Sequence, residues 1–203
     1  MSQKNNLFYN LLSNVHIYNF FQKIMSATRV REEFVKKYIK KEFNVIDIGS
    51  GPSSILRRLP KINYYGFDID PFHINYAKLK YSRKNFNFFC QKLTKKKIFK
   101  LPKFDCALLL GIVHHLNDVE FDKILNLIKI RLKKRGKILI LDSVLTKKQN
   151  FISRFLIKKD RGDNIRKLKD FKFILNKYFK KINYKIDHQK FIPYTWLKIV
   201  CYK

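Results

Sequence analysis

Short apolar runs alternate with helical segments along the first 145 residues, and this alternation constrains the fold more than any other feature. Each run is nearly continuous in apolar residues, which is typical of strands buried on both faces. Strands that alternate with helices predict an α/β fold, in which a parallel sheet carries helices on both faces. The predicted strands lie at 43–48, 62–70, 86–90, within 104–116, and at 137–144.

The segments between these runs carry signals for helix starts and stops. Ser53 or Ser54 is expected to cap a helix over 53–59, and Pro71 to open one that runs to about Lys80. Asp118 is expected to cap a further helix, which Arg135 and Gly136 end. Apolar residues spaced by three and four predict helices in 7–42 as well.

The final third of the chain breaks the alternation. Residues 149–159 and 167–179 have helical spacing, and two strand-like runs follow at 182–189 and 194–203. Only Lys190 to Pro193 separate these two runs, which is too short for a crossover helix. The last two strands are therefore expected to form an antiparallel hairpin. No linker or repeat divides the chain, so we expect one domain.

The turn after the first strand is the best candidate for a ligand site. Gly49 and Gly51 follow Asp47 there, and glycines allow positive φ and a close approach of a ligand to the backbone. The second strand ends in Asp68, nineteen residues after Gly49, where a carboxylate can accept hydrogen bonds from ribose hydroxyls. A dinucleotide site would place a third glycine at position 54, which is Ser54 here.

These motifs, taken together, resemble those of class I S-adenosylmethionine-dependent methyltransferases. The resemblance rests on VIDIGSGP (45–52), YYGFDIDP (64–71), FDCALLLGIVHHLND (104–118), LKKRGKILILDSV (132–144) and the terminal hairpin. It implies a Rossmann-like, seven-stranded, mostly parallel sheet with helices on both faces. It also implies an N-terminal helical lid (1–42), a cofactor-binding core (43–145), substrate-recognition helices (146–180) and the C-terminal hairpin (181–203). The flanking segments at 17–39 and 149–166 resemble a bacterial subgroup, several of whose members look like enzymes that modify small molecules or cell-surface glycans.

The resemblance also implies which residues hold S-adenosylmethionine. Two positions depart from the family pattern. Ser53 replaces a glycine, a change that is tolerated if its φ is negative, and Lys92 replaces an aspartate that contacts the adenine. Lysine has no acceptor, so that contact would fall to Gln91 or Thr94. The implied cofactor-binding residues are Asp47, Gly49, Ser50, Gly51, Asp68, Ile69, Gln91 and Gly111.

His114 and His115 follow the fourth strand and are the candidates for a catalytic base. Methyl transfer needs a base only when the acceptor is a hydroxyl or a protonated amine. Neighbouring residues leaving a strand point in opposite directions, so only one histidine is expected to face the cleft. A structural role, with the ring hydrogen-bonded to the backbone, is an alternative that the sequence favours at least as strongly. No Asn-Pro-Pro-Tyr-type sequence follows this strand, which favours oxygen and simple amine acceptors.

Arg161 and Arg166 are candidates for binding the acceptor. They lie between the fifth strand and the hairpin, where an arginine can pair with a carboxylate or phosphate. The alternative is that the segment is only a turn between helices, in which Gly162 supplies a positive φ and Asp163 or Asn164 caps the next helix.

The formal net charge of +30 leaves two interpretations open. A basic protein attracts polyanions, which raises RNA methylation as an alternative function. However, the basic residues are mostly lysines spread over the whole chain, and Lys, Ile, Asn, Phe and Tyr share A/T-rich codons. We therefore favour a small-molecule or glycan acceptor over RNA, and a cofactor-binding protein without catalysis ranks third.

The remaining sequence signals predict a cytoplasmic protein without a metal. Cys90, Cys106 and Cys201 have no metal-ligand or redox spacing, and two of them lie in apolar runs typical of buried thiols. The opening residues do not resemble a signal peptide. The longest apolar run, from Cys106 to Val113, is too short to span a bilayer. The sequence does not indicate the oligomeric state.

Overall fold

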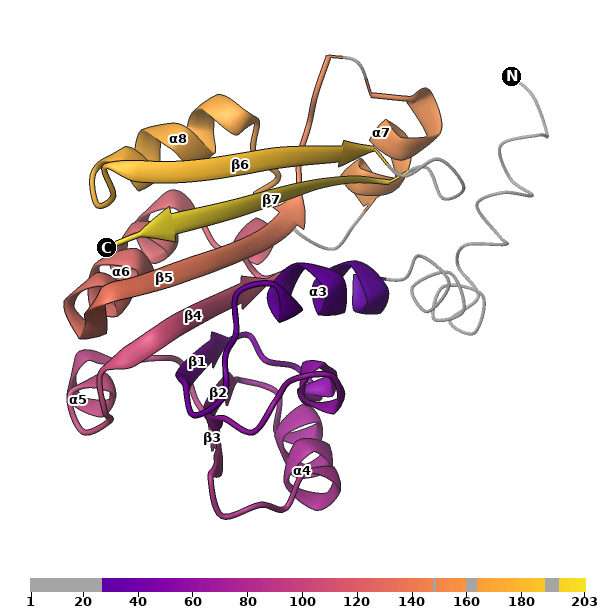
Figure 1. Ribbon diagram of the computed structural model, residues 1–203. Coiled ribbons are helices and arrows are strands. Elements are labelled where there is room, and N and C mark those ends of the chain that lie inside the picture. The colour runs from indigo at the N-terminus through magenta and orange to yellow at the C-terminus, as the bar shows by residue number, and fades with distance from the viewer. Residues whose placement is uncertain (1–26, 148, 160–163, 189–193) are drawn as a thin grey trace.

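The computed structural model describes residues 27–147, 149–159, 164–188 and 194–203 (Figure 1). Its centre is a seven-stranded sheet in the order β3-β2-β1-β4-β5-β7-β6. In chain order the elements are α3 (Ala27–Lys36), β1 (Asn44–Ile48), η1 (Ser54–Arg57), β2 (Asn63–Asp68), α4 (Pro71–Lys80), β3 (Phe86–Cys90), α5 (Lys95–Ile98), β4 (Phe104–Leu110), η2 (Val113–His115), α6 (Asp118–Arg131), β5 (Leu132–Ser143), α7 (Phe151–Lys159), α8 (Leu168–Asn176), β6 (Lys181–His188) and β7 (Thr195–Tyr202).

The pairing of the strands confirms the predicted architecture. Strands β3, β2, β1, β4 and β5 pair in parallel. Strand β7 runs antiparallel to both of its neighbours, β5 and β6. The predicted C-terminal hairpin is therefore present, and the sheet is the Rossmann-like sheet expected from the alternation of strands and helices.

Two apolar cores lie on opposite faces of the sheet, as the doubly apolar strands require. One core packs α6 and α8 against residues such as Ile46, Leu109 and Ile140. The other packs α3 and η1 against the alternate residues of the same strands, including Val45, Leu108 and Leu139. Figure 1 shows α3 on the face of the sheet opposite α6. Successive strand residues point to opposite faces, so each strand supplies both cores.

The starts of the helices differ in detail from the predictions. Helix α4 begins at Pro71 as expected, and the Asp70 side chain accepts a hydrogen bond from the Phe72 amide. Helix α6 is capped by Asn117 and not by Asp118, which is its first residue. Asn117 and Glu120 form a reciprocal capping box, and this arrangement satisfies two of the amides that a helix start leaves unpaired.

Two further predictions of secondary structure were wrong. Residues 54–57 form a short 3-10 helix without a side-chain cap, where a serine-capped α-helix was expected. Helix α6 ends at Arg131, and β5 begins at once at Leu132. The pairing of β4 with β5 is irregular between Phe104 and Cys106. This irregularity lets a continuous strand include Arg135 and Gly136, where we expected a helix end.

The N-terminal prediction is only partly within the described residues. Helix α3 lies inside the predicted helical segment 7–42, whereas residues 1–26 lie outside what the structure describes. Of the cysteines, Cys106 and Cys201 are buried and Cys90 is exposed. No helix in the described ranges combines the length and the apolar character needed to cross a membrane.

Candidate active site

The candidate site lies where the chain reverses its direction of travel across the sheet. From β1 the chain proceeds outward to β2 and β3, then returns to β4 on the other side of β1. The loops after β1 and β4 therefore separate from one another at the carboxyl edge of the sheet. Such a switch point is the usual ligand crevice of an open α/β sheet.

The loop after β1 is held against the end of β2. The amides of Gly49 and Ser50 both donate to the carbonyl oxygen of Phe67, at 2.8 and 3.0 Å. The amide of Gly51 donates to Oδ2 of Asp68 at 2.7 Å. Gly49 and Gly51 have φ values of 67° and 51°, as predicted. A Cβ built at Gly51 meets no atom within 4 Å, so this part of the loop borders open space.

Ser53 adopts a conformation that the sequence analysis did not expect. Its φ is 52°, in the left-handed region, so the condition under which a serine was to replace glycine without strain is not met. The side chain is fully buried, and its hydroxyl lies 3.2 Å from the hydroxyl of Tyr64. We attribute the retention of the strained backbone to this packing and hydrogen bond.

Asp47 is a buried carboxylate below the loop. Its Oδ2 accepts a hydrogen bond of 2.6 Å from the hydroxyl of Tyr64. Its Oδ1 is buried and has no hydrogen-bond partner among the described residues. Burial raises the pKa of Asp47 to about 7, and the negative charge of Asp68 adds to this, while the Tyr64 hydrogen bond and the positive charge of Arg31 oppose it. A group that supplies a positive charge or a donor near Oδ1 would stabilise the ionised form.

Arg31 of helix α3 is a site residue that the sequence analysis missed. Its guanidinium lies against Gly111, which follows β4 and has a φ of 74°. Its charge also acts on Asp47, at the end of β1. Arg31 therefore spans the switch point between the two strands. No local pattern marks it, because its position depends on how α3 packs on the sheet.

His114 is tied to a second buried carboxylate, that of Asp142 in β5. His114 Nδ1 lies 2.6 Å from Asp142 Oδ1, and the amides of Val113 and Ser143 also donate to this carboxylate, at 2.7 and 2.8 Å. Asp142 is completely buried. The sequence analysis did not select Asp142 as a site residue. The signal that could have indicated it is an acidic residue within the otherwise apolar run KILILDSV (137–144).

The two histidines do not point in opposite directions, contrary to the prediction. Strand β4 ends at Leu110, and His114 and His115 belong to the 3-10 helix η2. Their ring centroids are 4.1 Å apart. His114 is buried and His115 is exposed. The alternation rule applies only to extended backbone, so it fails in this turn.

Arg166 has a structural role in place of the predicted substrate contact. It is buried, and its guanidinium donates to Asp118 and to the carbonyl oxygens of Val113, Leu116 and Asn164. These bonds use all five N–H groups, so none is left for a carboxylate or phosphate. We therefore revise its role to holding the loop that carries His114. Arg161 lies outside the described residues.

The remaining predicted cofactor residues lie at the ends of β2 and β3. Ile69 is 66% exposed and follows Asp68. Gln91 is exposed after β3, and the Thr94 side chain caps α5 by accepting from the Lys97 amide. Lys92 Nζ lies 3.3 Å from Glu120 Oε1, so this lysine is paired with helix α6. Within the described ranges, no three His, Cys, Asp or Glu side chains cluster as metal ligands would.

A family comparison identifies the kind of domain. A sequence model described as a methyltransferase domain matches residues 39–191, which include every described residue of the candidate site except Arg31. No curated protein matches the chain at the level of sequence.

Solved structures share the fold at low sequence identity. Human N-acetylserotonin methyltransferase in complex with S-adenosylmethionine superposes with a TM-score of 0.65 at 20% identity, covering 91% of this chain and 55% of that one. The 1,6-didemethyltoxoflavin-N1-methyltransferase of Burkholderia thailandensis gives 0.67 at 14%, covering 97% and 87%. The plantazolicin methyltransferase gives 0.65 at 18%, covering 97% and 94%. The chain thus spans about half of the human enzyme and most of the other two.

Proposed function

Since the chain belongs to the methyltransferase domain family, we propose that it transfers a methyl group from S-adenosylmethionine to an oxygen or amine nitrogen of a small-molecule acceptor. The cofactor supplies, when bound, an electrophilic methyl group on a sulfonium. The protein's contribution to such a displacement is to orient the reactants and to exclude water. The single observation that carries the proposal is the convergence of Asp47, Asp68 and Arg31 at the switch point of the sheet.

The described residues fit an amino-acid nucleoside. The Asp68 carboxylate accepts one hydrogen bond on each oxygen, from the Gly51 and Asp70 amides, and has lone pairs left for ribose hydroxyls. The unpaired Oδ1 of Asp47 suits the ammonium group of the methionine end. Arg31 supplies a guanidinium for its carboxylate at the same switch point. Lys92 is turned to Glu120, so we assign the adenine contact to Gln91 and to the apolar surface of Ile69.

Small-molecule acceptors are supported by the named structural neighbours. Two of these neighbours are named as methyltransferases of N-acetylserotonin and of 1,6-didemethyltoxoflavin, which are both small molecules. We therefore choose a compact, partly aromatic acceptor as the leading class. A glycan acceptor is the second candidate class within this proposal, and the named neighbours do not include a glycan methyltransferase.

For hydroxyl acceptors we propose His114 as the base and Asp142 as the residue that positions it. The Asp142 carboxylate already accepts amides and is completely buried, so we assign the proton of the short contact to His114 Nδ1. Nε2 is then the basic nitrogen of the ring. A buried carboxylate that orients an imidazole in this way also stabilises the imidazolium that forms when a proton is taken up.

The free thiols support a reducing location, and we propose the cytoplasm. Cys90 is exposed as a free cysteine at the end of β3, which suits a compartment where disulfides do not form.

Isothermal calorimetry with S-adenosylhomocysteine tests the cofactor site. We expect the wild-type chain to bind, and Asp68→Ala to bind at least about tenfold more weakly, because bonds to a charged acceptor are lost. Asp70→Ala is the matched control, since that carboxylate caps α4 and should leave the affinity unchanged. No binding by the wild-type chain would refute the proposal.

Transfer of a radiolabelled methyl group tests the acceptor and the base. The probes are N-acetylserotonin, 1,6-didemethyltoxoflavin and a mixed tRNA fraction. For a hydroxyl probe that accepts label, His114→Gln should lower the single-turnover rate by about 10²-fold or more, and raising the pH should partly restore it. His115→Gln is the matched control. An unchanged rate in His114→Gln would remove the base assignment without affecting the cofactor site.

A further inference from the structure

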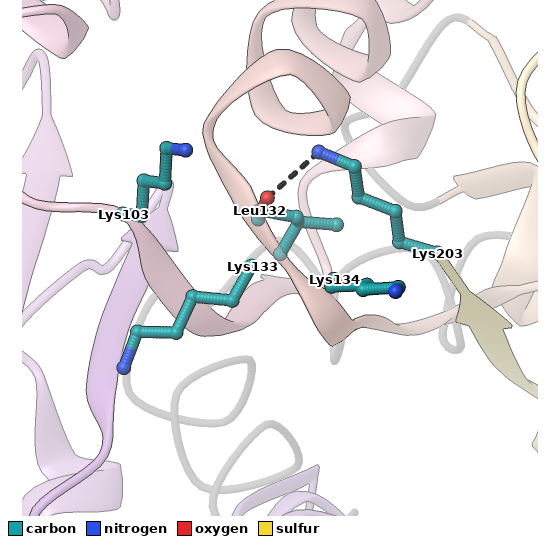
Figure 2. A pocket seen from close by; sticks show the side chains of 5 residues that line it. All are labelled: Lys103, Leu132, Lys133, Lys134 and Lys203. Atoms are coloured by element: carbon teal, nitrogen blue, oxygen red, sulfur yellow. Dashed lines mark hydrogen bonds between the residues drawn. The ribbon is translucent and has the colours of Figure 1, made fainter.

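A hollow lined almost entirely by lysines lies away from the candidate active site. Its volume is about 680 Å³, and its lining residues are Lys103, Leu132, Lys133, Lys134 and Lys203 (Figure 2). Lys103 precedes β4, the residues 132–134 open β5, and Lys203 follows β7, which runs antiparallel to β5. The hollow therefore lies at the amino edge of the parallel strands, opposite the edge that carries Asp47 and Gly111.

One of these lysines is held in place by the backbone. Lys203 Nζ donates to the carbonyl oxygen of Lys129 at 2.8 Å, where helix α6 ends. It also donates to the carbonyl oxygen of Leu132 at 2.7 Å (Figure 2). Lys129 lies in the last turn of α6, where the final carbonyls have no amide of the same helix to pair with, and Leu132 is the first residue of β5. The ammonium group therefore bonds to one carbonyl of the helix end and one of the strand start, and its third N–H has no hydrogen-bond partner among the described residues.

The hollow carries more positive charge than its surroundings neutralise. Lys133 Nζ pairs with Asp105 at 2.7 Å, and that carboxylate also accepts the Asn44 amide. The ammonium groups of Lys103 and Lys134 have no carboxylate partner in the part of the chain that the structure describes. Burial and the neighbouring charges of Lys103 and Lys129 lower the pKa of Lys203, as expected where like charges gather.

We propose that this hollow binds an anion bearing two or more phosphate groups, at a site separate from methyl transfer. Four lysines from three separate segments line this hollow, and ammonium groups bind phosphate as point charges. The volume lies within the range of small-molecule sites and exceeds what a single phosphate fills. A free polyphosphate and a nucleic-acid backbone both present several phosphate groups. The experiment below therefore uses one probe of each kind.

The test compares two double variants of the full chain. Lys103→Gln/Lys134→Gln removes the two unpaired ammonium groups, and Lys78→Gln/Lys169→Gln removes two exposed lysines from α4 and α8 with the same change in net charge. The probes are tripolyphosphate and a single-stranded RNA of about ten nucleotides, each titrated at about 50 and 200 mM salt. S-adenosylhomocysteine is titrated in parallel to show that both variants keep the cofactor site.

We expect the hollow variant to bind a phosphate probe at least about tenfold more weakly than the control variant, which should match the wild-type chain. If the hollow variant loses affinity for tripolyphosphate, the site is assigned to a small polyphosphate. Loss confined to RNA, with a steep salt dependence, assigns it to a nucleic-acid backbone. If the two variants bind the probes with equal affinity, or if the wild-type chain binds neither probe, the proposal is overturned. The proposed methyltransferase function would be unaffected by either result.

Discussion

At the scale of single residues, the site is organised around buried carboxylates whose partners come from other elements. Asp47 is 2% exposed and bonded to Tyr64, whereas Asp142 is completely buried and bonded to His114 and to backbone amides. The two carboxylates differ in how well they are satisfied. Asp142 has several donors, but Oδ1 of Asp47 has none among the described residues. This difference suits Asp142 to a fixed role and Asp47 to receiving a ligand.

Asp47 should make the stability of the ligand-free protein depend on pH. Its pKa is raised from 3.8 to about 7 in the folded chain, so the folded state holds a proton that the unfolded state has already lost between these values. Asp47 should therefore lower the unfolding free energy as the pH rises from about 4 to about 7, by at most about 1.4 kcal/mol per pH unit. Urea unfolding of wild type and Asp47→Asn across this window measures the effect. Asp47→Asn should remove this part of the slope, and identical slopes would contradict the prediction.

Gly111 should be intolerant of a side chain for two separable reasons. Its φ of 74° strains any other residue, and a Cβ would force the end of the Arg31 side chain to move away. Gly111→Ala should lower the unfolding free energy by about 1–3 kcal/mol and weaken S-adenosylhomocysteine binding. Gly51→Ala is a matched control for stability, because its φ of 51° brings strain without a collision. Equal losses of stability in the two variants would show that the Arg31 contact is unimportant.

At the scale of elements, capping decides where helix α6 starts and hence where the loop with His114 ends. Asn117 and Glu120 close the capping box, while Asp118 pairs with Arg166. The sequence places Asn117 and Asp118 side by side, and both residue types are good caps. The backbone geometry, with Asn117 extended at φ −68° and ψ 172°, selects the first of them.

Replacement of the cap gives a test at this scale. Asn117→Ala should lower the unfolding free energy by about 1 kcal/mol, because the Glu120 amide loses its acceptor. Asn117→Asp retains an acceptor oxygen at the helix start and should be close to wild type. Chemical denaturation compares the three chains. If both substitutions destabilise equally, a property of Asn117 other than capping is responsible.

At the scale of the whole molecule, Arg166 joins parts of the chain that are far apart in the sequence. It lies before α8, yet it holds the carbonyls of Val113 and Leu116 and the carboxylate of Asp118. Its guanidinium also lies over the ring of Phe121 in α6. Through these bonds the C-terminal part of the chain fixes the loop between β4 and α6.

Arg166→Lys should therefore affect both stability and the site. An ammonium group cannot bond to the several acceptors that the planar guanidinium reaches, so buried carbonyls lose donors. We expect a fall in the unfolding free energy on the order of 2–4 kcal/mol and a lower methyl-transfer rate, with a smaller change in S-adenosylhomocysteine affinity. Arg154→Lys is the control, since that exposed arginine makes, among the described residues, one long side-chain contact to the Thr146 carbonyl. A variant as stable as the control would contradict the bracing role.

The sequence alone was sufficient for the architecture and for the conformation of the two glycines after β1. Continuous apolar runs require burial on both faces, and a four-residue connection forces the last two strands to be antiparallel. The positive φ values at Gly49 and Gly51 were likewise predictable, because glycine adopts them without cost. These features depend on the local pattern of residue types and on short distances along the chain, and both can be read from the sequence.

The tertiary structure alone decided which side chains meet at the site. The pairing of His114 with Asp142, the contact of Arg31 with Gly111 and the use of Arg166 as a brace join residues from distant segments. The buried hydrogen bond of Ser53 holds a φ that the sequence alone did not predict. Such contacts depend on how helices and loops pack on the sheet. The periodicity of apolar residues sets which face of an element is buried, but not which polar group lies opposite it.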